Sequence, residues 1–229
     1  MKYGIVGNGD RSTHMQQLLD AMWIATRDYE SKPNPDAVYI STPPWSHASI
    51  SKYWLERGVH VLVEKPLCTN LKDALKLYEL AEDHHVTLME VMGAHNQRPE
   101  LSPQNIKATL GFKSKTAPNP IHDLGVYLVY LALWINGLDV ISVEAKGSSF
   151  SLDWSSGLHG DFVCSTRIEL PNTINGHSLM FKIDDGLIVQ QFEEYSMNGF
   201  IPYKDITLTA MSILTELCCQ KSTAHHQMS

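Results

Sequence analysis

The sequence predicts an α/β protein in which a mostly parallel sheet is followed by an α+β domain with a mostly antiparallel open sheet. Over the first 98 residues, short apolar runs alternate with helical patterns, as in a parallel sheet whose strands are joined by helices. A glycine turn follows the first apolar run. Beyond Arg98-Pro99 the pattern changes to strand-like runs separated by turn residues. We therefore expect one domain over 1–98 and a second over 99–229.

The first domain shows repeated cycles of strand and helix. The expected strands are Tyr3–Val6, Asp36–Ile40, His60–Val63 and Val86–Val91, and the expected helices are His14–Met22, His47–Arg57 and Asn70–His84. These strands are apolar at almost every position, which is typical of a sheet covered by helices on both faces. The last of the helices repeats its apolar residues at three- and four-residue spacing. We expect right-handed connections between the strands.

The second domain carries one strongly apolar helix among strand-like segments. The expected elements are a strand at Ile106–Phe112, a helix at Leu124–Ile135, strands at Ser142–Ala145, Phe162–Leu170, Ser178–Ile183 and Leu187–Phe192, and a closing helix at Lys204–Cys219. Turn residues separate the later strands, which predicts hairpins and antiparallel pairing. We expect the polar residues after Cys219 to be disordered.

Composition excludes several classes of function. The formal charge is -7 and Lys and Arg do not cluster, which argues against a nucleic-acid groove. No apolar run approaches the roughly 20 residues of a membrane helix, and the first residues do not have a signal-peptide pattern. The histidines and the four cysteines lack metal-ligand spacing, so we assign no metal and expect reduced thiols. We expect a cytoplasmic protein that binds neither nucleic acid nor a membrane.

The first candidate ligand site is Gly7-Asn8-Gly9, between the first strand and the first helix. Glycines at this spacing let the backbone approach a pyrophosphate, and they match the first two glycines of the dinucleotide-binding fingerprint. Ser12 occupies the third glycine position, and an ordinary tight turn is the alternative interpretation. Asp28 lies at the separation expected of an acidic residue that binds ribose hydroxyls, but the chain before it is short, and a loop aspartate is the alternative.

Two further segments follow expected strands, at the carboxyl edge where open α/β sheets bind ligands. Ser41-Thr42-Pro43-Pro44 follows the strand that ends at Ile40, and Glu64-Lys65-Pro66 follows the strand that ends at Val63. The side chains that we expect at the cofactor are those of Ser41, Thr42, Pro44, His47, Glu64 and Lys65. For His47, a solvent-facing position at the start of a helix is the alternative.

The stretch from Asp36 to Leu67 resembles the Gfo/Idh/MocA oxidoreductases, the family of glucose-fructose oxidoreductase and inositol dehydrogenase. The resemblance rests on Asp36-Ala37-Val38-Tyr39-Ile40-Ser41-Thr42-Pro43-Pro44, on His47, and on His60-Val61-Leu62-Val63-Glu64-Lys65-Pro66-Leu67, which contains the family's Glu-Lys-Pro signature. It implies a Rossmann-type domain that binds NAD or NADP. It also implies that Lys65 contacts cofactor and substrate, and that the peptide bond before Pro66 is cis.

A second similarity lies at His122-Asp123-Leu124-Gly125-Val126-Tyr127, which resembles the family's Asp-x-Gly-x-His/Tyr segment. The final tyrosine is similar to that of glucose-fructose oxidoreductase and dimeric dihydrodiol dehydrogenase. The resemblance implies that Tyr127 exchanges the substrate's hydroxyl proton, that Lys65 favours the phenolate, and that Asp123 orients substrate hydroxyls or Lys65. On a helix, Asp123 and Tyr127 share one face. The alternative for Tyr127 is a core position beside Tyr130.

The resemblance thus implies an NAD(P)-dependent oxidoreductase that acts on a sugar, polyol or dihydrodiol as a homodimer or homotetramer. Two alternatives are a non-catalytic regulator that binds a dinucleotide or sugar on the same fold, and an inactive paralogue with a shortened first domain. The chain is shorter than members of the family, chiefly near residues 19–29 and 97–121. Either loops are missing from the sequence or a real deletion has removed the second strand.

Overall fold

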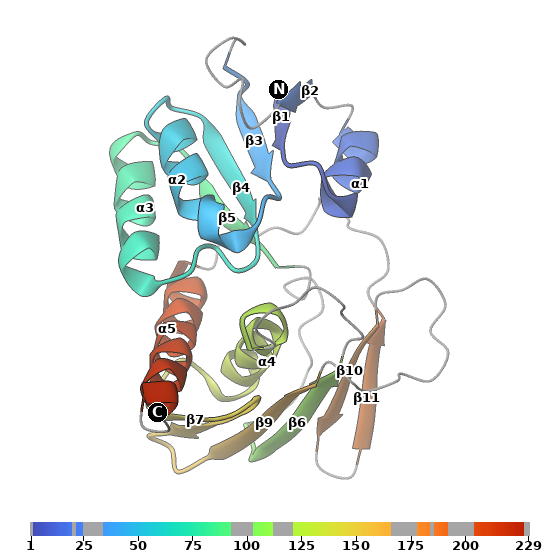
Figure 1. Ribbon diagram of the computed structural model, residues 1–229, viewed down its shortest axis with the longest axis vertical. Coiled ribbons are helices and arrows are strands. Elements are labelled where there is room, and N and C mark those ends of the chain that lie inside the picture. Colours follow the sequence, from blue (N-terminus) through green and yellow to red (C-terminus); the bar gives the residue numbers. More distant parts are fainter. Residues whose placement is uncertain are drawn as a thin grey trace. The chain divides into compact units, whose positions relative to one another are not determined.

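The computed structural model describes residues 2–19, 22–24, 34–92, 103–111, 121–165, 178–183, 186–191 and 204–226. The chain divides into two compact units, each with its own sheet (Figure 1). One unit comprises Met1–Met92 with Pro202–Met211, and the other comprises Gly93–Ile201 with Ser212–Ser229. Among the helices of the described ranges, none is long and apolar enough to cross a membrane.

The first unit is a parallel sheet of five strands, as the alternation of strands and helices predicts. The strands are β1 (Tyr3–Val6), β2 (Met22–Ile24), β3 (Ala37–Ile40), β4 (His60–Glu64) and β5 (Leu88–Val91), in the order β2-β1-β3-β4-β5. Its helices are α1 (Asp10–Leu19), α2 (Pro44–Leu55) and α3 (Leu71–Asp83). Figure 1 shows α1 on the opposite side of this sheet from α2 and α3. Helices on both faces explain why every residue of β3 and β5 is buried.

Strand β2 corrects the alternative in which a deletion has removed the second strand. Met22–Ile24 pairs with β1 in parallel, and Trp23 lies opposite Ile5. The apolar spacing of the sequence predicts a first helix over His14–Met22, whereas α1 spans Asp10–Leu19 and Met22 begins β2. Three residues are too few to show a period of their own, so pairing with β1 decides their conformation. Asp28 lies outside the described residues.

Local signals set the ends of α2 and α3. Pro44 starts α2. A backbone N–H at the first position of a helix has no acceptor within the helix, so proline costs no hydrogen bond there. Asn70 caps α3, and its side-chain oxygen accepts a 2.9 Å hydrogen bond from the backbone N–H of Asp73. Gly58 follows α2 with a φ of +70°, a conformation that glycine adopts without strain.

The second unit contains a mixed sheet and a hairpin. The strands are β6 (Ile106–Gly111), β7 (Val140–Lys146), β8 (Ser149–Trp154), β9 (His159–Ser165), β10 (Ser178–Ile183) and β11 (Gly186–Gln191). The sheet order is β6-β9-β8-β7, and β10 pairs with β11. Only the β6–β9 pair is parallel among these described pairs, so the expectation of a mostly antiparallel sheet is confirmed.

Two elements of this unit differ from the sequence expectation. Strand β8 was not expected, although its residues alternate between half-buried and buried as a strand with one covered face does. Helix α5 (Lys204–His226) continues beyond Cys219 through residues expected to be disordered. No glycine or proline interrupts residues 204–226, so no backbone signal ends the helix earlier. Residues 166–170 of the expected strand Phe162–Leu170 lie outside the described residues.

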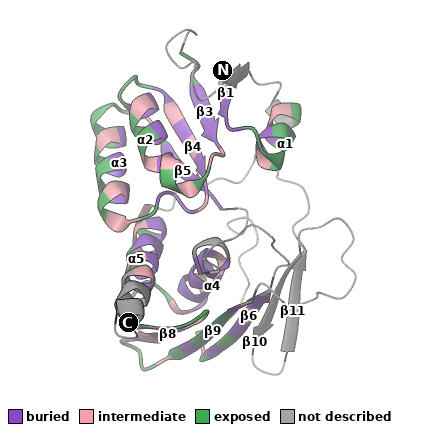
Figure 2. Ribbon diagram, in the orientation of Figure 1, coloured by how far each residue is buried: buried purple, intermediate pink, exposed green. Residues whose placement is uncertain are grey.

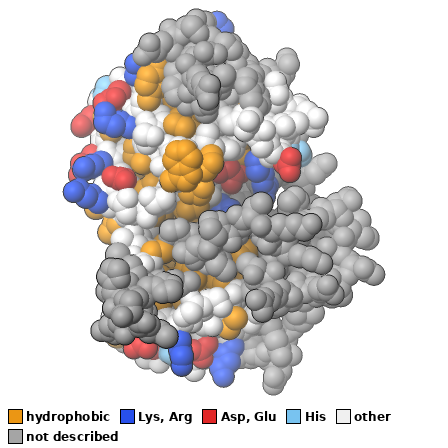
Figure 3. All heavy atoms as spheres, viewed as in Figure 1, with side chains coloured by type: hydrophobic (Ala, Val, Ile, Leu, Met, Phe, Trp, Pro, Cys, Tyr) orange, Lys and Arg blue, Asp and Glu red, His pale blue; other side chains and the backbone are white. Residues whose placement is uncertain are grey.

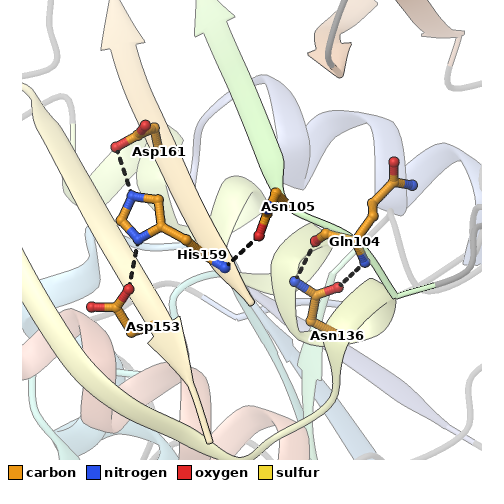
Figure 4. A network of polar contacts seen from close by, with 6 residues as sticks. All are labelled: Gln104, Asn105, Asn136, Asp153, His159 and Asp161. Carbon is orange, nitrogen blue, oxygen red and sulfur yellow. Dashed lines mark hydrogen bonds and ion pairs between the residues drawn. The ribbon is translucent and has the colours of Figure 1, made fainter. Parts of the chain in front are cut away.

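Helix α4 (Val126–Asn136) forms the core of the second unit, where Figure 2 shows it largely buried. Residues Ile121–Gly125 form a π-helical turn that leads into it. At its other end, the Asn136 amide donates to the backbone oxygen of Gln104 and accepts from its N–H, both at 2.9 Å (Figure 4). The Asn136 side chain thus satisfies both backbone groups of Gln104 and connects the end of α4 to the residues just before β6.

Candidate functional site

The glycine turn and the segment after β3 meet at one point of the first unit. Strands β1 and β3 are neighbours in the sheet, but their helices leave towards opposite faces (Figure 1). The Ser41 N–H donates to the carbonyl of Val6 at 2.8 Å, and the hydroxyl oxygens of Ser12 and Ser41 are 2.5 Å apart. The carboxyl ends of β1 and β3 therefore form a topological switch point, where ligands bind in open α/β sheets.

Gly7 and Gly9 require glycine for different reasons. Gly7 has a φ of +141°, and a Cβ there would lie 2.6 Å from the Ser12 hydroxyl and 2.8 Å from the Ser41 carbonyl oxygen. The fold itself thus requires glycine at this position. A Cβ at Gly9 would meet no protein atom within 4 Å, and its φ is not positive. The backbone at position 9 is therefore open to close approach by a ligand, which is the role of glycine in dinucleotide sites.

The residues of this turn fit a dinucleotide. Asn8 and Gly9 are exposed at the start of α1, where backbone N–H groups have no helical acceptor. Such a helix start binds phosphate groups. Ser12 occupies the third glycine position, and its hydroxyl forms a hydrogen bond with the hydroxyl of Ser41.

Lys65 lies directly beyond β4, on the same carboxyl edge of the sheet. The peptide bond between Lys65 and Pro66 is cis, which confirms the expectation from the resemblance. Lys65 is half-buried, whereas Glu64, Pro66 and Leu67 on both sides of it are buried. The Glu64 carboxylate accepts a 2.6 Å hydrogen bond from the hydroxyl of Tyr39 on β3. The neighbours of Lys65 are therefore fixed by the core of the unit.

His47 is fully buried, which corrects its alternative interpretation as a solvent-facing helix residue. Its Nδ1 lies 2.8 Å from the carbonyl oxygen of Pro66, and its Nε2 lies 2.7 Å from that of Thr42. Burial lowers the pKa of His47, and its hydrogen bonds to the two carbonyls oppose this shift. Because both nitrogens face backbone oxygens, the geometry favours support of two loops over the direct cofactor contact expected from the sequence.

Glu90 was not singled out from the sequence and contacts the same loop. It lies on β5 with 2% of its surface exposed, and its carboxylate accepts a 2.8 Å hydrogen bond from the backbone N–H of Leu67. A glutamate inside the apolar run Leu88–Val91 is the signal that points to it, because a buried carboxylate requires hydrogen-bond partners.

The remaining predicted residues of the first unit lie at the start of α2. The Thr42 hydroxyl accepts a 2.8 Å hydrogen bond from the Ser46 side chain, and Pro44 begins the helix. Figure 3 shows apolar side chains reaching the surface of the molecule, and Trp45 is the most exposed of the large apolar side chains described, at 77%. An exposed indole at this sheet edge offers a flat apolar surface to a ligand.

Asp123 and Tyr127 belong to the second unit, whereas Lys65 belongs to the first. Asp123 lies in the π-helical turn and Tyr127 in the first turn of α4. Tyr127 is half-buried, whereas Tyr130 is fully buried. Tyr127 is thus more accessible than a core aromatic. A Cβ on Gly125 would lie 3.1 Å from Ile121 and 3.6 Å from Cys164 of β9, so this glycine lets the turn pack closely.

A separate polar network occupies the sheet of the second unit (Figure 4). The two ring nitrogens of His159 lie 2.6 Å from Asp153 and 3.2 Å from Asp161, and the His159 N–H donates to Asn105. The hydrogen bond to Asp153 is the main cause that raises the pKa of His159. Within the described ranges, no group of three or more His, Cys, Asp or Glu residues is placed to hold a metal ion.

Comparison with known proteins relates the first unit to a family of oxidoreductases. Residues 11–92 match a family model (GFO_IDH_MocA). The family is described as "Oxidoreductase family, NAD-binding Rossmann fold". A putative oxidoreductase, YceM, of Salmonella typhimurium is 34% identical over 116 residues, which are 44% of this chain and 37% of that protein. Trans-1,2-dihydrobenzene-1,2-diol dehydrogenase of Mus musculus is 27% identical over 173 residues, which are 62% of this chain and 52% of that protein.

Solved structures match the fold over almost the whole chain. UDP-N-acetylglucosamine 3-dehydrogenase GnnA from Acidithiobacillus ferrooxidans has a TM-score of 0.69 at 14% identity, with 97% of each chain covered. The chain aligns with about half or less of the two curated relatives. The sequence match over residues 11–92 and the fold match over both units agree: residues 11–92 are similar to the Gfo/Idh/MocA oxidoreductases, and both units share the fold of the solved structures.

Proposed function

We propose that this protein is an NAD(P)-dependent oxidoreductase that moves a hydride between the nicotinamide and a hydroxyl or carbonyl carbon of a sugar, polyol or dihydrodiol. The observation that carries the proposal is the position of Lys65. It follows β4 on the carboxyl edge of the sheet that holds the glycine turn, directly before a cis peptide bond. An oxidoreductase can use a half-buried ammonium at this position.

In this proposal, Tyr127 exchanges the proton of the reacting hydroxyl. The ordinary pKa of a tyrosine is about 10, so its phenolate costs roughly 4 kcal/mol at neutral pH. The Lys65 ammonium lowers that cost by favouring the phenolate, and Asp123 orients substrate hydroxyls or the ammonium. Gly7, Asn8, Gly9, Ser41, Thr42, Pro44 and Glu64 form the cofactor side of the site, with His47 behind it. Bound NAD or NADP supplies the hydride chemistry.

The substrate class follows from the names of the similar proteins. One acts on a dihydrodiol and another on a nucleotide sugar. Both present a secondary hydroxyl beside other polar groups, which suits a site with a carboxylate and a phenol. We therefore choose UDP-N-acetylglucosamine, trans-1,2-dihydrobenzene-1,2-diol, D-xylose and myo-inositol as the first substrates to assay, each with NAD and with NADP.

The decisive experiment is Tyr127→Phe. We expect turnover to fall by about 100-fold or more, the usual contribution of a positioned acid or base, while NADH or NADPH still quenches the tryptophan fluorescence. Tyr130→Phe, at the neighbouring buried ring, is the matched control and should keep its activity. A Tyr127→Phe protein with full turnover would remove the proton-transfer role.

The two alternatives give different results in the same assays. A non-catalytic regulator binds the dinucleotide or sugar but turns over none of the four substrates. An inactive paralogue is stabilised against heat by neither NADH nor NADPH. The Gly7 geometry and the Ser12–Ser41 contact support an intact nucleotide site.

A cytoplasmic homodimer or homotetramer is part of the proposal. The outward face of β9 gives it limited support, since Val163 is 38% exposed but its neighbours on that face, His159 and Asp161, are polar. An interface on this face is therefore more polar than a domain core. Light scattering of the purified protein measures the mass directly, and a monomer at micromolar concentration would contradict this part.

A further inference from the structure

The peptide group between Pro66 and Leu67 is held at both ends by buried side chains. Its carbonyl oxygen lies 2.8 Å from Nδ1 of His47, and its N–H donates to the Glu90 carboxylate at 2.8 Å. His47 is fully buried and Glu90 is 2% exposed, so water competes for neither hydrogen bond. The two side chains come from α2 and β5 and reach one peptide plane from opposite directions.

These contacts leave Lys65 little backbone freedom. Pro66 fixes its own φ and has no N–H, so the Pro66–Leu67 peptide group is the first one after Lys65 that hydrogen bonds can hold at both its carbonyl and its N–H. Rotation of that peptide plane would break the hydrogen bonds to His47 and Glu90 together. A carboxylate at the N–H end also makes the carbonyl a stronger acceptor, so the two hydrogen bonds reinforce each other.

We propose that Glu90 and His47 are positioning residues that clamp the Pro66–Leu67 peptide and thereby fix the ammonium of Lys65. The inference rests on the proposed function, in which this ammonium acts on cofactor and substrate. Through its second nitrogen, 2.7 Å from the Thr42 carbonyl, His47 also couples the Lys65 loop to the segment that follows β3. The clamp therefore sets Lys65 relative to the nucleotide edge of the same sheet.

The test measures Lys65 itself and needs no substrate. The full-length protein is acylated with a trace of acetic anhydride, and mass spectrometry compares the rate at Lys65 with that at Lys52, an exposed lysine on α2. Glu90→Gln keeps an acceptor oxygen, whereas Glu90→Met removes it at similar volume. Glu79→Met, at an exposed position of α3, is the control for the substitution.

We expect Glu90→Met to raise the relative acylation rate of Lys65 by about fivefold, the population change that loss of one hydrogen bond allows. Glu90→Gln and Glu79→Met should match the unsubstituted protein. His47→Leu, which removes the imidazole at the other end of the same peptide, should act like Glu90→Met and provides a second test if Glu90→Met does not fold.

Equal rates in the unsubstituted protein and in a folded Glu90→Met or His47→Leu protein would overturn the clamp. Equal increases in Glu90→Gln and Glu90→Met would also overturn it, because the charge and not the hydrogen bond would then matter. The proposed function is judged separately, by whether NADPH or NADH protects Lys65 from acylation in the unsubstituted protein. Absence of that protection contradicts the cofactor role of Lys65 without affecting the comparison of variants.

Discussion

The side chains around Gly7 show how one residue links fold and ligand site. The space that a Cβ would occupy is filled by Ser12 and by the backbone and hydroxyl of Ser41. The close approach of β1 to the segment after β3 therefore depends on the absence of a side chain. Two positions later, Gly9 faces no such neighbour. The Gly7-Asn8-Gly9 turn thus contains one glycine that the fold requires and one that, in the proposed function, the cofactor requires.

This difference predicts opposite results for two matched substitutions. Gly7→Ala should lower the free energy of unfolding by about 1–3 kcal/mol, because alanine rarely adopts this φ and its Cβ would clash with Ser12 and Ser41. Gly9→Ala should change stability by less than about 1 kcal/mol yet weaken NADH or NADPH binding, since only a ligand approaches that atom. Chemical denaturation and fluorescence titration measure the two effects. A stable Gly7→Ala protein, or normal binding by Gly9→Ala, would contradict this division.

Sequence reasoning reached most, but not all, of the candidate residues. Gly7, Lys65 and the cis bond before Pro66 are detectable because a motif places them at the ends of strands. Glu90 carries no motif, and its importance appears only when β5 lies beside β4 and the Leu67 N–H needs an acceptor. His47 was found, but its burial and its two carbonyl partners depend on packing that no local pattern encodes.

Among the elements, long or strongly patterned segments were predictable and short ones were not. Strands β3 and β4 and helix α3 agree with their sequence patterns to within two residues. Strand β2 has three residues and exists because β1 offers it a pairing edge. Strand β8 alternates as strands do, but its serines and aspartate resemble a loop. The parallel β6–β9 pairing joins segments far apart in the chain, which local patterns do not specify.

The β8–β9 pair carries a pH-dependent contact at His159. Asp153 and Asp161 raise its pKa, so its stabilising contribution is complete below the unfolded pKa of about 6.5 and is lost as pH rises through the folded value. All three side chains are about half exposed, so solvent screening limits the contribution to under about 1 kcal/mol.

We expect the protein to lose more stability than its His159→Gln variant when the pH is raised from about 6 to about 8.5. Asp153→Asn, which removes the main cause of the shift, should behave like His159→Gln. Urea denaturation at the two pH values provides the comparison. Identical losses in the unsubstituted protein and both variants would show that this network does not contribute.

At the scale of the molecule, α5 belongs to both compact units. Its residues up to Met211 are part of the first unit, where Lys204 pairs with Glu82 and Thr207 hydrogen bonds to Tyr78. The residues from Ser212 onward are part of the second unit. Buried apolar side chains occur in both parts, so each unit depends on its own portion of one helix.

Substitutions in the two portions should therefore affect different units. Ile206→Ala and Leu217→Ala each remove a buried side chain and should cost about 2–5 kcal/mol. Glu216→Ala, at an exposed position of the same helix, should cost less than about 0.5 kcal/mol. Calorimetry combined with hydrogen exchange should show Ile206→Ala weakening mainly the first unit and Leu217→Ala the second. Equal weakening of both units by each substitution would mean that they unfold as one.

The packing at Gly7 also has an evolutionary consequence. Positions 7, 12 and 41 share one small space. The hydroxyls of Ser12 and Ser41, 2.5 Å apart, fill it, and they fit only because Gly7 has no Cβ. Substitutions in contact do not act additively, so the effect of a change at one of these positions depends on the residues at the other two. A Ser12→Gly change frees room beside Gly7, whereas a larger residue at position 41 fills it. The three positions should therefore drift as a set, and mutant libraries of this site should vary them jointly.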